Sequence, residues 1–319
     1  MVEGILSKAF WVVYATVFAA ATVVYGQQVP CYFIFGDSTF DSGNNNNLQS
    51  KAKVNYSPYG IDFPEGPTGR DFIPPFAGAS PKQAHIGMNY ASGGGGLRKE
   101  TSKHLGGRIS LRKQIQNHKK AIKKAKVPVQ RLEQCLYTIN IGSNDYINNY
   151  FMSELYNTSS LFDPNEYAYS LNRLYRTHLK RLHSLGARKI ALFSISLIGC
   201  TPKMIVSHGG GQGCAKDVNA AVAIFNNNLK DLVNDFNKNF KGAEFTYVDI
   251  FSAGDPLAFA RLGFKVGDKG CCTLSPGEEL CVPNKPVCAN RSEYLFWDDI
   301  HSSEATNKMA AIGSFYGPL

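Results

Sequence analysis

Four short apolar runs recur along the chain, and each ends in polar or glycine-containing residues. They span Cys31–Phe35, Leu136–Ile141, Lys189–Ile195 and Phe245–Ile250. Short runs rich in aromatic and β-branched residues are typical of strands buried inside a parallel sheet. The pattern therefore predicts four strands of a sheet that is covered on both faces.

Helical periodicity fills the intervals between these runs. Leucines and other apolar residues recur at helical spacing in Glu166–Leu185, which Gly186 terminates, and again in Lys216–Phe240. Strands that alternate with helices indicate βαβ units and an α/β fold. Without an internal repeat or a linker, we expect residues 27–319 to form a single domain.

A formal net charge of +9 raises the question of a nucleic-acid partner. Only Lys113–Lys126 is densely basic, and it lacks the pattern of a finger, a recognition helix or an aromatic-interleaved module. We therefore expect this run to be the solvated face of a helix, and we expect no nucleic-acid partner. A weak attraction to acidic cell-wall polysaccharide is compatible with the charge.

The N-terminus has the pattern of a secretory signal peptide. Lys8 precedes an apolar run at Phe10–Tyr25, and the small residue Gly26 ends it at a candidate cleavage site. We expect removal of residues 1–26. The run is short for a bilayer span, and no later segment reaches that length, so no transmembrane segment is expected in the mature chain.

The cysteines are consistent with an oxidising compartment. Four of the eight crowd one Gly/Pro-rich stretch, and two more, Cys200 and Cys214, bracket a glycine-rich loop. Their spacing does not match a zinc site, so we expect disulfides. Cys200–Cys214 is one predicted pair, and a second is expected within the cluster, whose pairing the sequence leaves open. The cluster consists of Cys271, Cys272, Cys281 and Cys288.

Three sequons add to the secretory pattern. Asn-X-Ser/Thr triplets begin at Asn55, Asn157 and Asn290. Such triplets accept N-linked glycans when they are exposed on a secreted protein. We therefore predict that the mature chain is a glycoprotein.

Polar residues follow two of the predicted strands directly. Ser38 lies just beyond the first, and Asn144 lies just beyond the second. In open α/β sheets, ligands bind outside the carboxyl ends of the strands. The two polar turns are therefore expected to share one rim of the sheet and to form a site there.

A serine becomes a nucleophile when a base takes its proton and a third group orients that base. Asp298 and His301 lie three residues apart, a spacing that lets a carboxylate reach the imidazole Nδ1–H while Nε2 faces outward. Asp299 is a second candidate for orienting the imidazole. The sequence thus suggests a triad of Ser38, His301 and an aspartate, preferably Asp298.

An oxyanion formed by such a serine needs hydrogen-bond donors. The glycine-rich stretch Asn89–Leu97 can bring backbone N–H groups close to a substrate, and Asn144 can add a side-chain amide. The motif G-x-S-x-G is absent, which disfavours the nucleophile elbow of the α/β-hydrolase fold.

Four sequence blocks in a fixed order carry a family resemblance. They are FIFGDSTFDSGNNN, MNYASGGGGL, IGSNDYINNYF and YLFWDDIHSSEATNK. With these blocks the chain resembles the plant GDSL-type esterase/lipases of the SGNH hydrolase superfamily, over nearly its whole mature length. The resemblance implies a flavodoxin-like three-layer α/β/α sandwich with a central parallel sheet.

The resemblance also implies roles for individual residues. Ser38 is expected to be the nucleophile and, through its N–H, one oxyanion donor. Gly94 and Asn144 fall where the family places its other two donors, and His301 and Asp298 fall on the base and its orienting acid. No metal or organic cofactor is implied.

These implications predict a secreted serine esterase of the apoplast or cell wall. Its substrate would be an acyl lipid or an acylated cell-wall ester, cleaved through an acyl-enzyme. One departure keeps a binding protein with impaired catalysis as an alternative: directly after Arg70 the chain is shorter than the family pattern. An acyltransferase that uses the same acyl-enzyme is a third reading.

Overall fold

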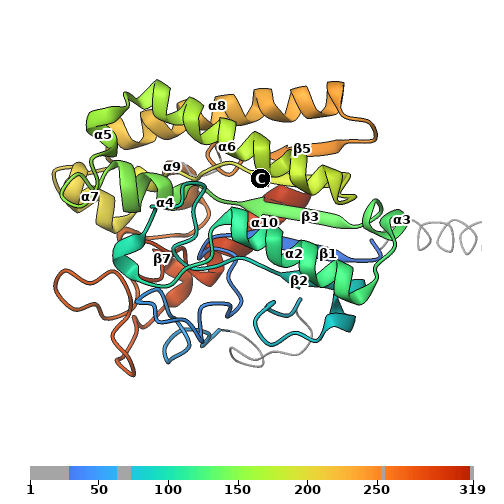
Figure 1. The fold of residues 1–319 in the computed structure, drawn as a ribbon. Coiled ribbons are helices and arrows are strands. Elements are labelled where there is room, and N and C mark those ends of the chain that lie inside the picture. The colour runs from blue at the N-terminus through green and yellow to red at the C-terminus, as the bar shows by residue number, and fades with distance from the viewer. Residues whose placement is uncertain (1–28, 63–72, 253–255, 317–319) are drawn as a thin grey trace, which may run out of the picture.

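The computed structural model describes residues 29–62, 73–252 and 256–316 (Figure 1). The predicted signal peptide, residues 1–26, and Arg70 lie outside these ranges.

A five-stranded parallel sheet forms the centre of the fold. Its spatial order is β2-β1-β3-β4-β5, the flavodoxin-like order. The predicted α/β fold with a central parallel sheet is therefore confirmed. One strand of this sheet is not among the predicted ones, because β2 has three residues and is too short to show a pattern. The strands are β1 (Tyr32–Gly36), β2 (Gly87–Asn89), β3 (Leu136–Asn140), β4 (Lys189–Phe193) and β5 (Glu244–Val248).

Three long helices form one layer against the sheet: α2 (Leu111–Ala125), α6 (Pro164–Ser184) and α8 (Lys216–Asn239). Helix α6 packs against both α2 and α8, and α6 and α8 run side by side along the sheet in Figure 1. Most of the face they cover is buried, with side chains such as Phe33 and Ile139 at 0% exposure. The lysines of α2 point to solvent, as expected for the basic run.

The opposite face of the sheet is covered less completely. Alternate strand residues on this side, including Tyr32, Ile34 and Phe193, are only half-buried. The described part of the connection from β1 to β2 contains only one short 3-10 helix, η2 (Pro81–His85), which contacts α2. The described residues therefore cover this face less closely than the face of α2, α6 and α8. Helix α10 (Glu304–Tyr316) contributes to the other face through Met309, which lines a pocket together with Phe193.

A second, two-stranded parallel sheet carries the cysteine cluster. It consists of β6 (Val266–Gly270) and β7 (Tyr294–Phe296). The disulfides Cys271–Cys288 and Cys272–Cys281 follow β6 and pack around Trp297, which follows β7. These two bonds define the pairing that the sequence left open.

Two further disulfides stabilise the main domain. Cys200 and Cys214 form the expected pair. Cys31 and Cys135 form a pair that the sequence did not suggest, because 104 residues separate them. They meet because Cys31 precedes β1 and Cys135 precedes β3, and these two strands are neighbours in the sheet.

The remaining helical elements are short. They are η3 (Lys103–Leu105), α3 (Val129–Leu132), α4 (Ser143–Asp145), η4 (Tyr146–Tyr150), α5 (Thr158–Leu161), η5 (Ile198–Cys200), α7 (Pro202–His208), α9 (Pro256–Arg261) and η7 (Arg291–Glu293). No helix within the described ranges is both long and apolar enough to cross a bilayer. The three sequon asparagines, Asn55, Asn157 and Asn290, are exposed.

Candidate active site

Ser38 lies in the turn that follows β1, at the carboxyl end of the sheet. The turn is fixed from two sides. Asp37 N–H donates to the carbonyl of Asn140 at the end of β3, at 3.2 Å. The side-chain amide of Gln114, on α2, accepts from Gly36 N–H at 3.0 Å and donates to its carbonyl at 2.7 Å. The backbone that presents Ser38 is therefore held by the sheet and by a helix.

Asparagines after Ser38 connect this turn to the glycine-rich stretch. The side-chain amide of Asn44 donates to the carbonyls of Asn89 and Ala91, at 3.0 and 2.8 Å. Asn45 donates to the carbonyl of Gly93 at 2.9 Å. Both asparagines are buried. Their amides thus supply the hydrogen bonds that a buried, irregular backbone requires.

His301 lies between Ser38 and Asp298. Its Nε2 is 2.7 Å from Oγ of Ser38, and its Nδ1 is 2.9 Å from Oδ2 of Asp298. Oδ1 of Asp298 accepts the N–H groups of Ile300 and His301, at 2.9 and 2.7 Å, so the carboxylate caps the loop on which the histidine lies. Among the described residues no hydrogen bond joins the Asp299 carboxylate to His301, whereas the Asp298 carboxylate contacts Nδ1.

The electrostatics of the pair match this geometry. Burial disfavours the charged imidazole, but the charge of Asp298 and its hydrogen bond, together with the carboxylates of Asp37 and Glu279, raise the pKa of His301 above its ordinary value. Burial also opposes ionisation of Asp298, yet His301 and the hydrogen bonds to the carboxylate hold the pKa of Asp298 below its ordinary value. His301 is therefore a stronger base than an ordinary histidine.

Two backbone N–H groups that line the pocket, those of Ser38 and Gly94, have no hydrogen-bond acceptor among the described residues. Gly94 has φ of +71°, a conformation that a residue with a side chain rarely adopts. Both residues line the same pocket as His301. Free N–H groups at such a position are suited to a developing negative charge.

Asn144 provides the third candidate donor. Its Nδ2 donates one hydrogen bond, to the carbonyl of Gly95 at 3.1 Å, and its second proton has no acceptor among the described residues. Its Oδ1 accepts from Nδ2 of Asn148 at 2.7 Å. With both ends of the amide occupied, the NH2 group is held on the side of the glycine-rich stretch.

The buried carboxylate of Asp145 connects the turn after β3 to the end of the glycine-rich stretch. Asp145 accepts from the N–H groups of Leu97 and Arg98, at 2.8 and 3.0 Å, and from the hydroxyl of Thr101 at 2.6 Å. Burial raises the pKa of Asp145 to about 6 in spite of these bonds. Asp145 therefore ties the turn that carries Asn144 to the end of the glycine-rich stretch.

One large pocket of about 1850 Å³ opens at this constellation. Its walls are predominantly apolar, and it extends from Ser38 along the half-covered face of the sheet to Phe193 and Met309. The described residues contain no group of three or more His, Cys, Asp or Glu side chains that is placed to hold a metal ion. A pocket of this kind accepts an apolar group beside a few convergent polar groups.

Three residues around the site were not found from the sequence: Gln114, Asn148 and Tyr59. In the sequence, Gln114 is one polar residue in a basic run and Asn148 is one of several asparagines. Tyr59 donates to Oδ2 of Asp298 at 2.6 Å from a loop without periodicity. For Asn148 alone a signal existed, since it lies four residues after Asn144, one helical turn away.

Comparisons with known proteins agree with this arrangement. A family model described as GDSL-like Lipase/Acylhydrolase matches residues 32–313. GDSL esterase/lipase At2g19010 of Arabidopsis thaliana is 66% identical, over 98% of this chain and 96% of its own length. GDSL esterase/lipase At2g19050 of the same plant is 57% identical, over 99% of this chain and 96% of its own length.

The alignment with the first relative spans 330 positions, whereas this chain has 319 residues, so the relative contains residues that this chain lacks. The matches nevertheless extend over nearly the whole chain. The family expected from the four sequence blocks is thereby confirmed, and the chain belongs to the GDSL-like lipase/acylhydrolase family.

Proposed function

We propose that the protein is a secreted serine esterase that hydrolyses carboxylic esters through Ser38, His301 and Asp298. The observation that carries this proposal is the continuous relay from Oγ of Ser38 to Nε2 of His301 and from Nδ1 to Asp298, at 2.7 and 2.9 Å. Membership of a family whose relatives are named esterase/lipases supports an ester substrate.

In the proposed mechanism, Nε2 of His301 takes the hydroxyl proton as Oγ of Ser38 attacks the acyl carbon. Asp298 holds the imidazole and stabilises its charged form. The oxyanion accepts hydrogen bonds from Ser38 N–H, Gly94 N–H and the free proton of Asn144. The C–O bond to the alcohol breaks, the alcohol takes the proton from His301, and water then releases the acid by the reverse sequence.

The apolar pocket favours an ester with an acyl chain. An acyl lipid places its chain along the apolar walls, whereas an acylated cell-wall polymer presents a short acyl group at the mouth. The four disulfides support secretion, because such bonds persist in oxidising compartments. Exposure of the three sequons is compatible with glycosylation, and the net positive charge with a weak attraction to acidic polysaccharide.

Hydrolysis of p-nitrophenyl acetate, butyrate and palmitate tests the proposal. The enzyme is secreted and purified beside Ser38→Ala and a control, Ser153→Ala, whose serine is exposed and lies outside the three sequons. We expect the wild type and the control to be active and Ser38→Ala to lose activity. Equal turnover by Ser38→Ala would overturn the proposal, and the chain-length profile separates a lipase from a short-acyl esterase.

The apolar pocket on the half-covered face of the sheet is also compatible with the non-catalytic alternative, in which an acyl chain binds there without hydrolysis. If the folded wild type hydrolyses none of these esters but binds a fatty acid, the protein is an acyl-binding member of the family. Product analysis with added alcohol distinguishes the acyltransferase reading, because a transferase forms a new ester where a hydrolase releases free acid.

A further inference from the structure

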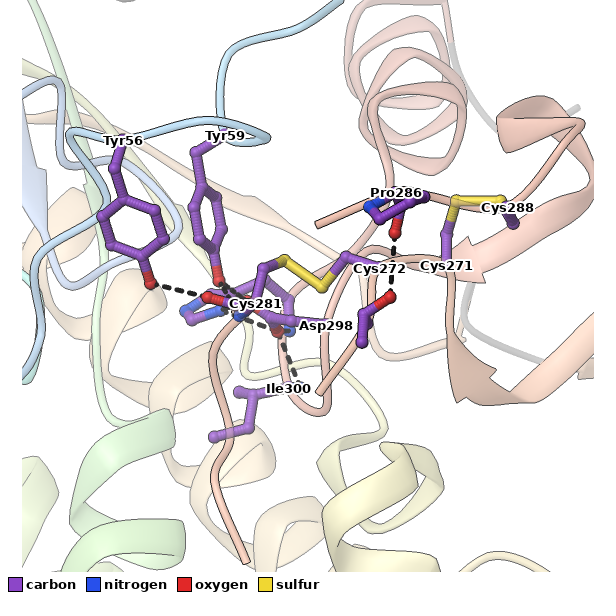
Figure 2. The surroundings of a disulfide bond; sticks show 11 residues. Tyr56, Tyr59, Cys271, Cys272, Cys281, Pro286, Cys288, Asp298 and Ile300 are labelled. Atoms are coloured by element: carbon purple, nitrogen blue, oxygen red, sulfur yellow. Dashed lines mark hydrogen bonds and ion pairs between the residues drawn. A yellow bond between two sulfur atoms is a disulfide. The ribbon is translucent and has the colours of Figure 1, made fainter. Parts of the chain in front are cut away.

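Asp298 has a second polar partner besides His301. Its side chain is fully buried, at 0% exposure. The hydroxyl of Tyr59 donates to Oδ2 at 2.6 Å, the same oxygen that lies 2.9 Å from Nδ1 of His301. Figure 2 shows Tyr59 pointing from its loop toward Asp298. A hydrogen bond to a buried carboxylate at this distance is a strong, charge-assisted one.

The direction of this bond is fixed by a second contact. The backbone N–H of Cys281 donates to the same Tyr59 hydroxyl, at 3.0 Å. A phenol has one proton to give, and here its oxygen already accepts a hydrogen bond, so the proton is directed to Asp298. Burial and the nearby Asp298 carboxylate raise the pKa of Tyr59, so the hydroxyl keeps this proton at all physiological pH values.

The Cys272–Cys281 disulfide holds both ends of this arrangement. Cys281 provides the N–H that orients Tyr59, and its bridge leads to Cys272. Cys272 N–H in turn donates to the carbonyl of Trp297, the residue before Asp298, at 2.9 Å. The donor loop and the acceptor loop are therefore fastened to the same covalent link, as Figure 2 shows for Tyr59, Cys281 and Asp298.

We propose that Tyr59 is a positioning residue of the reaction, which holds the Asp298 carboxylate and withdraws part of its charge from His301, and that the Cys272–Cys281 disulfide keeps Tyr59 in place. The inference rests on the proposed serine-esterase function. Tyr59 acts through Asp298 and touches neither Ser38 nor the reacting carbonyl.

Removal of the Tyr59 hydroxyl should raise the pKa of His301. Without the proton from Tyr59, Asp298 retains more negative charge toward His301 and stabilises the imidazolium more strongly. The pKa of His301 then rises, and the acid limb of the kcat/KM profile moves to higher pH. The other carboxylates that act on His301 are Asp37 and Glu279, and neither is changed by this removal.

The test compares Tyr59→Phe with Tyr56→Phe. Tyr56 lies in the same loop, its ring is 5.4 Å from that of Tyr59, and its hydroxyl donates to the carbonyl of Cys281 at 2.9 Å. Each variant thus loses one hydroxyl and one hydrogen bond to Cys281, but only Tyr59→Phe loses the bond to Asp298. This makes Tyr56→Phe a matched control.

We expect Tyr59→Phe to lower kcat about tenfold and to move the acid limb upward by about half a pH unit or more. Tyr56→Phe should keep the wild-type limb. A Tyr59→Phe profile that superimposes on that of the wild type would overturn the proposal. If Ser38→Ala remained active, the proposed function itself would fail; if Ser38→Ala is inactive while Tyr59→Phe matches the wild type, only the role of Tyr59 fails.

The disulfide provides a second variant that retains the tyrosine. Cys272→Ala/Cys281→Ala frees the loop that orients Tyr59, so its acid limb should also move to higher pH. Cys31→Ala/Cys135→Ala removes a disulfide that contacts no triad residue and controls for general destabilisation. If the acid limb of the kcat/KM profile lies at the same pH in the two double variants, the Cys272–Cys281 bond has no role in holding Tyr59.

Discussion

The side-chain amide of Asn148 donates to Oδ1 of Asn144 at 2.7 Å, and both asparagines are buried. Because the oxygen of the Asn144 amide faces Asn148, its NH2 group faces the other way, where it can donate to a substrate. The orientation of the proposed oxyanion donor is therefore set by a residue four positions later along the chain.

Removal of Asn148 should impair catalysis less than removal of Asn144. Loss of an oxyanion donor costs about 10²–10³ in kcat, which is the expectation for Asn144→Ala. Asn148→Ala leaves the donor in place but held only by its bond to the Gly95 carbonyl, so we expect a smaller loss, about tenfold. Steady-state kinetics of both variants with one p-nitrophenyl ester give the comparison.

The double variant tests whether the two residues act as one unit. Asn144→Ala/Asn148→Ala should be no slower than Asn144→Ala alone, because Asn148 acts through the amide that is already missing. If the loss of kcat in the double variant equals the product of the losses in the two single variants, Asn148 acts independently. That result would contradict the orienting role.

The pH dependence of kcat/KM should report the ionisation of His301. The base must be neutral to take the proton from Ser38, so activity falls as pH drops through the pKa of His301. Because Asp298 raises this pKa, the midpoint should lie above the ordinary histidine value of about 6.5. A midpoint below that value would contradict the assigned pair.

Replacement of Asp298 or Asp299 by asparagine, one at a time, tests which of the two orients His301. Asp298→Asn removes the charge that stabilises the imidazolium, so the acid limb should move to lower pH and kcat should fall on the order of 10³–10⁴. Asp299→Asn should retain wild-type kinetics, since no described hydrogen bond joins its carboxylate to His301. The opposite ranking of the two variants would make Asp299 the orienting acid.

Asp37 should make stability depend on pH. Its carboxylate is 1% exposed, and burial raises its pKa to about 6, against a hydrogen bond from the Thr39 N–H. A raised pKa means that the folded state binds the proton more tightly than the unfolded state. The protonated Asp37 carboxyl therefore adds to the free energy of unfolding. This stabilisation is complete below pH about 4, is lost as pH rises through about 6, and amounts to on the order of 2–3 kcal/mol.

Asp37→Asn cannot ionise and lacks this dependence. Relative to the wild type, the variant should therefore gain in free energy of unfolding between pH 4 and pH 7. Urea unfolding of both proteins at the two pH values measures the change, and Asp145, with a similarly raised pKa, is common to both. A difference between the proteins that stays constant with pH would refute the assignment to Asp37.

The Cys31–Cys135 disulfide should stabilise the whole domain. It closes a loop of 104 residues and lies just before two adjacent central strands. Removal of a disulfide that closes a long loop typically costs about 2–4 kcal/mol. We expect Cys31→Ala/Cys135→Ala to lose that much free energy of unfolding while its pH profile stays that of the wild type. An unchanged free energy of unfolding would contradict this role.

The sequence predicted those features that local pattern determines. The strands β1, β3, β4 and β5 are long enough to show an apolar run, and in a parallel sheet their carboxyl ends must share one edge. That alone places Ser38 beside Asn144. The pairing of His301 with Asp298 followed from a spacing of three residues within one loop.

Features that depend on tertiary contacts were beyond sequence reasoning. Strand β2 is too short to show a period, and its place beside β1 is fixed by pairing alone. Tyr59 reaches Asp298 across 239 residues, from a loop whose position the cysteine cluster determines. The partial exposure of Tyr32 and Phe193 is likewise a tertiary feature, which an apolar run does not reveal.

Covalent labelling of the nucleophile tests the central claim most directly. A fluorophosphonate places phosphorus where the acyl carbon would lie; Oγ of the attacking serine forms the P–O bond and fluoride leaves. Mass spectrometry of the digested protein should find the adduct on the peptide that carries Ser38, with labelling greatly slowed in His301→Ala. An active, folded enzyme that is labelled at another residue, or remains unlabelled, would contradict Ser38 as the nucleophile.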